Sequence, residues 1–130
     1  MQIDKSNRET FESEVYIHDS ILDEFRFDRG KKHLHLQITD TYPCLKQRSI
    51  DFFEVIGFEM SAGNYWGPSE RILDFEYIVE EKTLIPRLAE KRKNDRWPDF
   101  DVADPSKYIE LLITFVSGDT LRVACERMII

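Results

Sequence analysis

Two histidines that alternate with a leucine are the residues of this sequence best suited to chemistry. In His33-Leu34-His35 the imidazoles are two positions apart, and side chains two apart on a β-strand point to the same side. Imidazole nitrogen is a common ligand of Zn²⁺ and similar divalent ions, so the pair predicts part of a metal site, with Glu24 as the candidate third ligand. The alternative is two solvated histidines on an outer strand face, because metal sites usually take three or four protein ligands.

A second run contains the residue types of a catalytic site without its spacing. His18-Asp19-Ser20 brings together the members of a hydrolase triad, but triads are assembled from separate segments, and the sequence has no GxSxG nucleophile elbow. We interpret the run as a turn in which Asp19 or Ser20 binds nearby backbone N–H groups. Cys44 lacks an evident histidine partner, so we interpret it as an ordinary loop thiol. The sequence therefore predicts no catalytic residue and no cofactor.

Acidic residues at alternate positions form the third candidate site. In segments 10–17 and 73–79 carboxylates alternate with large apolar residues, which predicts two strands with acidic outer faces. Such a face would attract a basic protein, although strand exteriors are polar in any case. Aromatic residues in two loops are candidate anchors at its rim. The predicted binding residues are Glu12, Glu14, Asp74, Glu76, Glu80, Tyr65, Trp66, Trp97 and Phe100.

Composition limits the class of protein and its partners. The chain has 130 residues, 42% of them hydrophobic, which suits one domain, residues 1–130, with a continuous core. Its 25 acidic and 18 basic residues give a net charge of -7, which argues against nucleic acid and anionic membranes as partners. The sequence shows no signal-peptide pattern and no apolar run of membrane-spanning length. Because Cys44 and Cys125 also lack metal-type spacing, we predict a cytoplasmic protein with reduced thiols.

The clearest predicted element is a hairpin that contains the two histidines. Segments 21–27 and 33–38 both alternate polar and apolar residues, and a turn with a glycine separates them. If Phe25 pairs with Leu34, then Glu24 lies on the same face as the histidines. The metal hypothesis therefore depends on this register.

The remaining elements complete a mainly β chain. Segments 109–115 and 121–125 predict a second hairpin, whose last strand runs on to the C-terminus. Ser49–Met60 is too densely apolar for strict alternation, and a bulge near Phe52-Phe53 would explain this. Residues 83–94 are the only helix expected. The predicted fold is a single-domain sandwich or strongly curved antiparallel sheet of about six strands with one short helix and with ordered loops at 61–70 and 95–107.

Several short stretches resemble small bacterial immunity proteins of polymorphic toxin systems. These stretches are Ile17-His18-Asp19-Ser20-Ile21, then Phe25, Leu34, Leu36 and Ile38, and later Trp66-Gly67-Pro68-Ser69 and the Ser117-Gly118 turn. The family pattern has phenylalanine before the histidine, where this chain has Ile17. The resemblance implies a single β-rich domain that binds and blocks a cognate toxin, often a basic nuclease, and it transfers no catalytic residue.

Three functional hypotheses follow. The first is a non-enzymatic protein-binding module of the immunity or antitoxin kind, which binds a basic partner through its acidic faces. The second is a small metal- or ligand-binding domain that uses His33, His35 and Glu24. The third is a structural homo-oligomer, with the apolar residues Leu112 and Val116 of the last hairpin as its seam.

Overall fold

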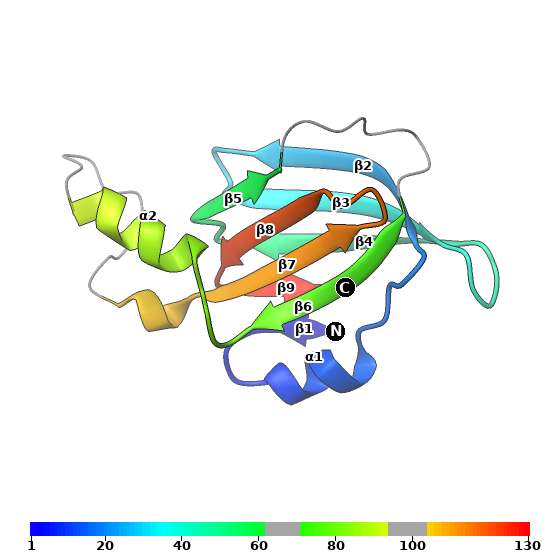
Figure 1. Cartoon of the computed structure of the whole chain (residues 1–130), viewed down its shortest axis with the longest axis horizontal. Helices are drawn as coiled ribbons and strands as arrows, with labels where there is room; N and C mark the ends of the chain where they lie inside the picture. The colour runs from blue at the N-terminus through cyan, green and yellow to red at the C-terminus, as the bar shows by residue number, and fades with distance from the viewer. Residues whose placement is uncertain (62–70, 94–103) are drawn as a thin grey trace.

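The chain folds as two antiparallel sheets packed face to face (Figure 1). In the computed structural model, residues 1–61, 71–93 and 104–130 are described. The five-stranded sheet has the order β1 (Gln2–Ile3), β9 (Arg127–Ile129), β4 (Lys46–Phe53), β3 (His33–Asp40) and β2 (Ile21–Asp28). The four-stranded sheet has the order β5 (Gly57–Met60), β8 (Thr120–Cys125), β7 (Ile109–Phe115) and β6 (Ile72–Ile78). This confirms the predicted mainly β fold.

The hydrophobic core lies between the sheets and explains the alternation along the strands. Leu34, Leu36 and Ile38 of β3 are buried, and so are Ile50 and Phe52 of β4. The odd-numbered residues of β7 and those of β8 face them from the other sheet and belong to the same cluster. Because one cluster takes side chains from both sheets, the layers share a single core.

The N-terminal acidic segment is a helix, which corrects the prediction of a strand over residues 10–17. α1 spans Arg8–Glu14. Its Phe11 is 3% exposed and packs edge-on against Phe75 and Tyr77 of β6, with ring centroids 5.0 and 5.8 Å apart. Phe11 and Val15 are four residues apart, which is a helical spacing as well as a strand spacing. Alternation over so few residues did not distinguish the two.

The predicted hairpin is confirmed as β2 and β3, but its register differs. Phe25 pairs with Leu36 instead of Leu34, and Phe27 pairs with Leu34. The register shifts between Leu22 and Glu24, because a bulge places an extra residue in β2. A bulge of this kind carries no marker in the alternation of the sequence.

Two chain segments pass from one sheet to the other, which corrects two further predictions. Ser49–Met60 is not one bulged strand, because β4 ends at Phe53, a turn with left-handed backbone at Glu54 (φ 52°) follows, and β5 begins in the other sheet. The last hairpin is confirmed as β7 and β8, yet its final strand stops at Cys125, and β9 joins the five-stranded sheet. Dense apolar content here reflects strands that contribute to both layers of one core.

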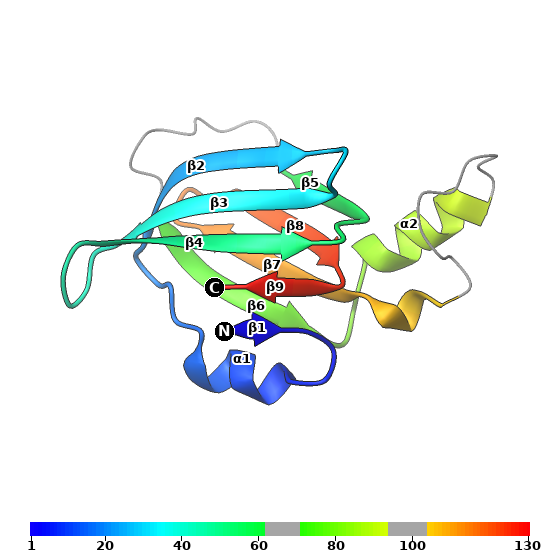
Figure 2. The same ribbon diagram turned by 180° about the vertical axis from the view of Figure 1, so that it is seen from behind.

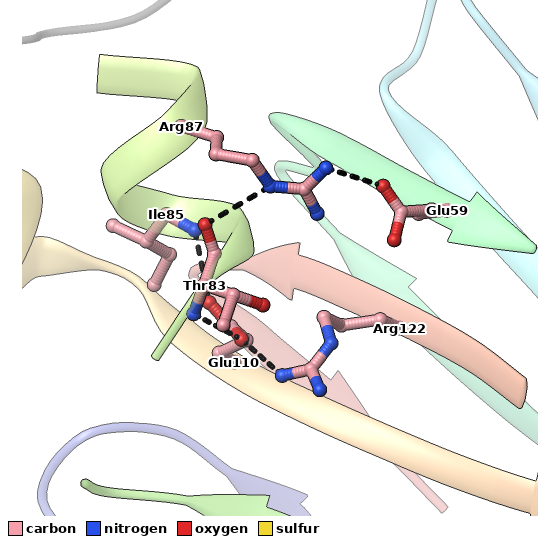
Figure 3. A network of polar contacts seen from close by, with 6 residues as sticks. All are labelled: Glu59, Thr83, Ile85, Arg87, Glu110 and Arg122. Carbon is pink, nitrogen blue, oxygen red and sulfur yellow. Dashed lines mark hydrogen bonds and ion pairs between the residues drawn. The ribbon is translucent and has the colours of Figure 1, made fainter. Parts of the chain in front are cut away.

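The helix predicted over residues 83–94 is α2 (Leu84–Lys93), which lies against the outer face of the four-stranded sheet. Its first turn sits over Glu110 of β7, whose side chain is fully buried. One Glu110 oxygen accepts the backbone N–H of Ile85 at 2.9 Å, and the other accepts that of Thr83 at 3.1 Å and the guanidinium of Arg122 at 2.6 Å (Figure 3). A carboxylate at a helix N-terminus satisfies N–H groups that have no partner within the helix.

Most of the two predicted loops lies outside the described residues. Of segment 61–70 only Ser61 is described, and of segment 95–107 only the end, which contains a short 3-10 helix, η1 (Pro105–Lys107). Within the described ranges no helix is long and apolar enough to cross a membrane. The cytoplasmic location stays a prediction.

Candidate functional site

The two histidines meet an aspartate on the outer face of the five-stranded sheet. His33 Nε2 lies 2.7 Å from Asp51 Oδ1, and His35 Nδ1 lies 2.8 Å from the same oxygen. The register pairs His35 of β3 with Asp51 of β4, so neighbouring strands hold the three side chains on one side. We call these residues the histidine–aspartate cluster.

The cluster is partly shielded and has defined neighbours. The side chains of His33, His35 and Asp51 are 26%, 17% and 20% exposed. The His33 ring stacks on Phe53 with an interplanar angle of 4° and centroids 4.8 Å apart. Arg127 of β9 lies over the same phenylalanine, 4.5 Å from its centroid. Phe53 therefore fixes the plane of one imidazole while solvent still reaches the cluster.

The charge state of Asp51 follows from its partners. Partial burial alone would raise the pKa of the Asp51 carboxyl, but hydrogen bonds from His35 and His33 outweigh it and hold the pKa below its ordinary value. An ionised carboxylate only accepts hydrogen bonds, so both imidazole nitrogens that face it carry a proton in this arrangement. The cluster thus consists of one carboxylate anion and the two imidazole N–H groups that donate to it.

The predicted third ligand, Glu24, does not join the cluster. It lies on the same face, but it pairs with Gln37 and its carboxylate is 3.9 Å from Arg26 Nη1. Asp51 takes its place, and the sequence carried a signal for it, since Asp51 stands between the apolar Ile50 and Phe52. The outward position of the Asp51 carboxylate could therefore be predicted from the sequence, but the pairing of β4 with β3 could not.

The acidic residues predicted in segments 10–17 and 73–79 lie together along one border of the molecule. Glu12 and Glu14 lie on α1, Asp74 and Glu76 lie on β6, and all four are exposed. We call these four residues the acidic edge. α1 packs against β6 through Phe11, so the helix correction brings the two groups of carboxylates together instead of separating them.

Two adjoining grooves run along β6, the first between this strand and α1 and the second between it and residues 15–18, which follow α1. The larger, about 360 Å³, is lined by residues that include Glu12 and Glu76. The smaller, about 260 Å³, includes Asp74 and the exposed residues Tyr16 and Leu73. The grooves share two lining residues, Val15 and Phe75. One Glu12 oxygen is 2.6 Å from Arg8 Nη2, so part of the negative charge is compensated within α1.

The other predicted binding residues are placed as follows. Glu80 is exposed just after β6. Leu73, expected to face inward, is 48% exposed because the register of β6 shifts between Ile72 and Asp74. The four aromatic anchors, Tyr65, Trp66, Trp97 and Phe100, lie outside the described residues.

The His18-Asp19-Ser20 run is a turn and not a triad. Ser20 is buried and donates its hydroxyl to Asp40 Oδ1 at 2.8 Å, while His18 Nδ1 is 2.6 Å from the carbonyl oxygen of Leu73. The serine and the histidine therefore bind different groups, although the bonds are not those expected for Asp19 and Ser20. Cys44 is exposed, between β3 and β4.

The proposed oligomer seam is interrupted by charge. Val116 is 58% exposed, but Leu112 is only half-buried and its strand partners are Glu76 and Arg122. An interface built on these two residues would have to accommodate both charges. The homo-oligomer hypothesis stays a prediction.

Comparisons with known proteins give little further guidance. No family model matches the chain, and no curated protein matches it. Among solved structures it is similar to an uncharacterized protein from Neisseria gonorrhoeae, with 17% sequence identity over 99% of this chain and 95% of that chain and with a TM-score of 0.47. A likeness at this level supports no functional conclusion.

Proposed function

We propose that this protein is a non-enzymatic binding module that docks a basic protein partner on the acidic edge, in the manner of an immunity protein. The observation that carries the proposal is the pair of adjoining grooves between β6 and residues 8–18, which have Glu12, Asp74 and Glu76 at their borders. The sequence resemblance to immunity proteins points to the same class of partner. The proposal requires no cofactor.

The edge combines the two features that protein recognition uses. Exposed carboxylates raise the encounter rate with a basic protein and suppress acidic competitors. Tyr16 is 65% exposed and Leu73 is 48% exposed beside Asp74, and apolar groups of this kind supply short-range affinity when a partner desolvates them. Charge would therefore steer the partner, and the apolar groups would hold it.

The β6 edge is better suited to side-chain contacts than to strand addition. The Ile72 N–H and C=O both bind backbone groups of residues 19–20, at 2.9 and 2.8 Å, and α1 packs beside the later part of the strand through Phe11. A covered edge resists pairing with another strand. We therefore expect a partner with basic side chains that reach over α1 and β6.

The proposal is tested by capture from a lysate of the source organism at low and high salt. We expect the wild-type protein to retain a basic protein at low salt and to lose it at high salt. The Asp74→Lys/Glu76→Lys variant should lose roughly ten-fold or more of the captured amount at low salt, since opposed charges become like charges.

The matched control is Asp23→Lys/Glu24→Lys, which reverses two exposed carboxylates on β2, the edge strand of the other sheet, and changes the net charge by the same amount. This variant should retain the partner. Equal losses in both variants would mean that net charge acts without a defined face. Capture of no basic protein at low salt would contradict the proposed function.

A further inference from the structure

We infer that the histidine–aspartate cluster is a binding site for a divalent transition metal ion of the zinc class. One nitrogen of His33, one nitrogen of His35 and one Asp51 oxygen all lie within 4.8 Å of one another, and His33 Nε2 and His35 Nδ1 are the nitrogens that face Asp51 Oδ1. The three residues come from adjacent strands, β3 and β4, with the sheet hydrogen bonds as their frame. This inference is independent of the acidic edge, which lies at the border between α1 and β6.

The distances fit a metal ion after a small movement. Zinc takes imidazole nitrogen and carboxylate oxygen at about 2.0–2.2 Å, so two ligands of a tetrahedral ion are about 3.3 Å apart. The two nitrogens now lie 2.7 and 2.8 Å from Asp51 Oδ1. Each gap therefore has to open by about 0.5 Å, which side-chain rotation can supply on a partly exposed strand face.

The ligand set selects the class of ion. Two imidazoles and one carboxylate suit Zn²⁺, Co²⁺ or Ni²⁺, whereas Mg²⁺ and Ca²⁺ take mainly oxygen ligands. Three protein ligands leave at least one position for water or for a donor group of another molecule. Figure 2 shows that the described helices lie beside the outer face of the five-stranded sheet and not across it, so the open position would face solvent.

Metal binding would require a change of tautomer in each imidazole, because the nitrogen that binds the ion cannot also carry a proton. His33 Nε2 and His35 Nδ1 now face the carboxylate as N–H donors. To bind the metal, each ring must present a lone pair at that same nitrogen, with its proton on the other ring nitrogen. A neutral imidazole therefore changes tautomer through solvent without net loss of a proton, and the carboxylate stays ionised throughout.

The tautomer change gives a test on the unaltered protein. Tag-free, chelator-dialysed, ¹⁵N-labelled protein is titrated with Zn²⁺ and the imidazole nitrogens are followed by NMR. We expect His33 to become a ligand through Nε2 and His35 through Nδ1, with one Zn²⁺ bound per chain. His18, whose Nδ1 binds the Leu73 carbonyl, should keep its signals. Unchanged signals of His33 and His35 at several equivalents of Zn²⁺ would overturn the inference.

Calorimetry on four variants gives a second, independent test. His35→Gln should weaken Zn²⁺ binding more than about ten-fold, since a ligand contributes at least as much as the groups that orient it. His18→Gln removes the histidine outside the cluster, Cys44→Ser removes the exposed thiol, and both should bind Zn²⁺ like the wild type. A loss of affinity in either control without one in His35→Gln would contradict the site, as would equal affinity for Mg²⁺ and Zn²⁺. Glu76→Lys should leave Zn²⁺ binding unchanged, which separates this site from the acidic edge.

Discussion

Two carboxylates on the outer faces of the two sheets have opposite surroundings. Glu110 on the four-stranded sheet is 0% exposed beneath α2 and is bound by two backbone N–H groups and by Arg122 (Figure 3). Asp51 on the five-stranded sheet keeps a side chain that is 20% exposed and accepts from two imidazoles through one oxygen. One carboxylate is enclosed, and the other is partly exposed to solvent.

The difference lies in what their partners can do. A backbone N–H group and a guanidinium are permanent donors, because neither has a lone pair to offer at neutral pH. The surroundings of Glu110 therefore have one use, which is to fix α2 on the sheet. An imidazole can donate or accept at the same nitrogen, so the partners of Asp51 can turn from hydrogen bonding to metal binding. Buried charge indicates stability here, and exchangeable donors indicate chemistry.

The largest effect is expected from Glu110→Gln. The substitution keeps the shape of the side chain but leaves Arg122 without its anion and presents an amide to two backbone donors. Removing one member of a buried, hydrogen-bonded ion pair costs about 3 kcal/mol, so the free energy of unfolding measured in urea should fall by that order. Glu59→Gln is the control, because Glu59 binds Arg87 on the same face but is half-exposed. Equal losses in both variants would contradict a special role for Glu110.

The same carboxylate should make stability depend on pH. Burial alone would raise the pKa of Glu110, but the N–H groups of Ile85 and Thr83 and the Arg122 guanidinium hold it below its ordinary value of 4.5. The unfolded chain therefore takes up the proton first as the pH falls, so the stability from this group is present above pH 4.5 and is lost as the pH falls through the lower, folded-state pKa.

The measurement is urea unfolding of wild type and Glu110→Gln from pH 7 downward. The wild type should lose its advantage over the variant below about pH 4.5, where the unfolded-state carboxyl protonates. An advantage that stays constant across this range would show that it comes from packing and not from charge.

Sequence patterns could predict the layers of this fold but not how they are joined. Alternation in β2, β3, β7 and β8 follows directly from one buried face per strand, so both hairpins were predictable. The turn at Glu54 and the crossing after Cys125 were not, because the strands before and after each of them contribute apolar residues to the same core whichever sheet they enter. The prediction of a strand over residues 10–17 is wrong for a related reason, since Phe11 and Val15 satisfy both helical and strand spacing.

The candidate site divides in the same way. The placement of His33 and His35 on one face of a strand follows from local geometry alone, and this prediction is confirmed. The third member, Asp51, is brought to the histidines by the pairing of β3 with β4 and by the register of that pair. This register depends on contacts between separate strands and not on the alternation within one strand. Glu24 lies on the neighbouring strand of the same hairpin, so local alternation alone favours it as the third ligand. The register between strands that are far apart in the sequence is set by their packing in the folded protein, which a local residue pattern does not encode.

Asp51→Asn should have a smaller effect on stability than Glu110→Gln. Its partners His33 and His35 are half-buried and can be hydrated, so the loss should be about 1 kcal/mol in the presence of a chelator. The difference in stability between the wild type and Asp51→Asn should grow when Zn²⁺ is added, because only the wild type gains stability from binding in the folded state. A loss as large as that of Glu110→Gln would make Asp51 a structural anchor of the same kind and would remove the contrast between the two carboxylates.

The smallest effect is expected where the polar network of α2 reaches solvent. Arg87 Nη1 lies 2.7 Å from Glu59 Oε2, and its Nε donates to the Thr83 carbonyl at 3.3 Å, but both charged side chains are half-exposed. Exposed ion pairs gain little over hydration and lose side-chain entropy. Arg87→Ala should therefore unfold at the same urea concentration as the wild type within error, at low and at high salt. A clear loss at low salt that disappears at high salt would show that this outer pair helps to hold α2, and that the enclosed Glu110 does not fix the helix alone.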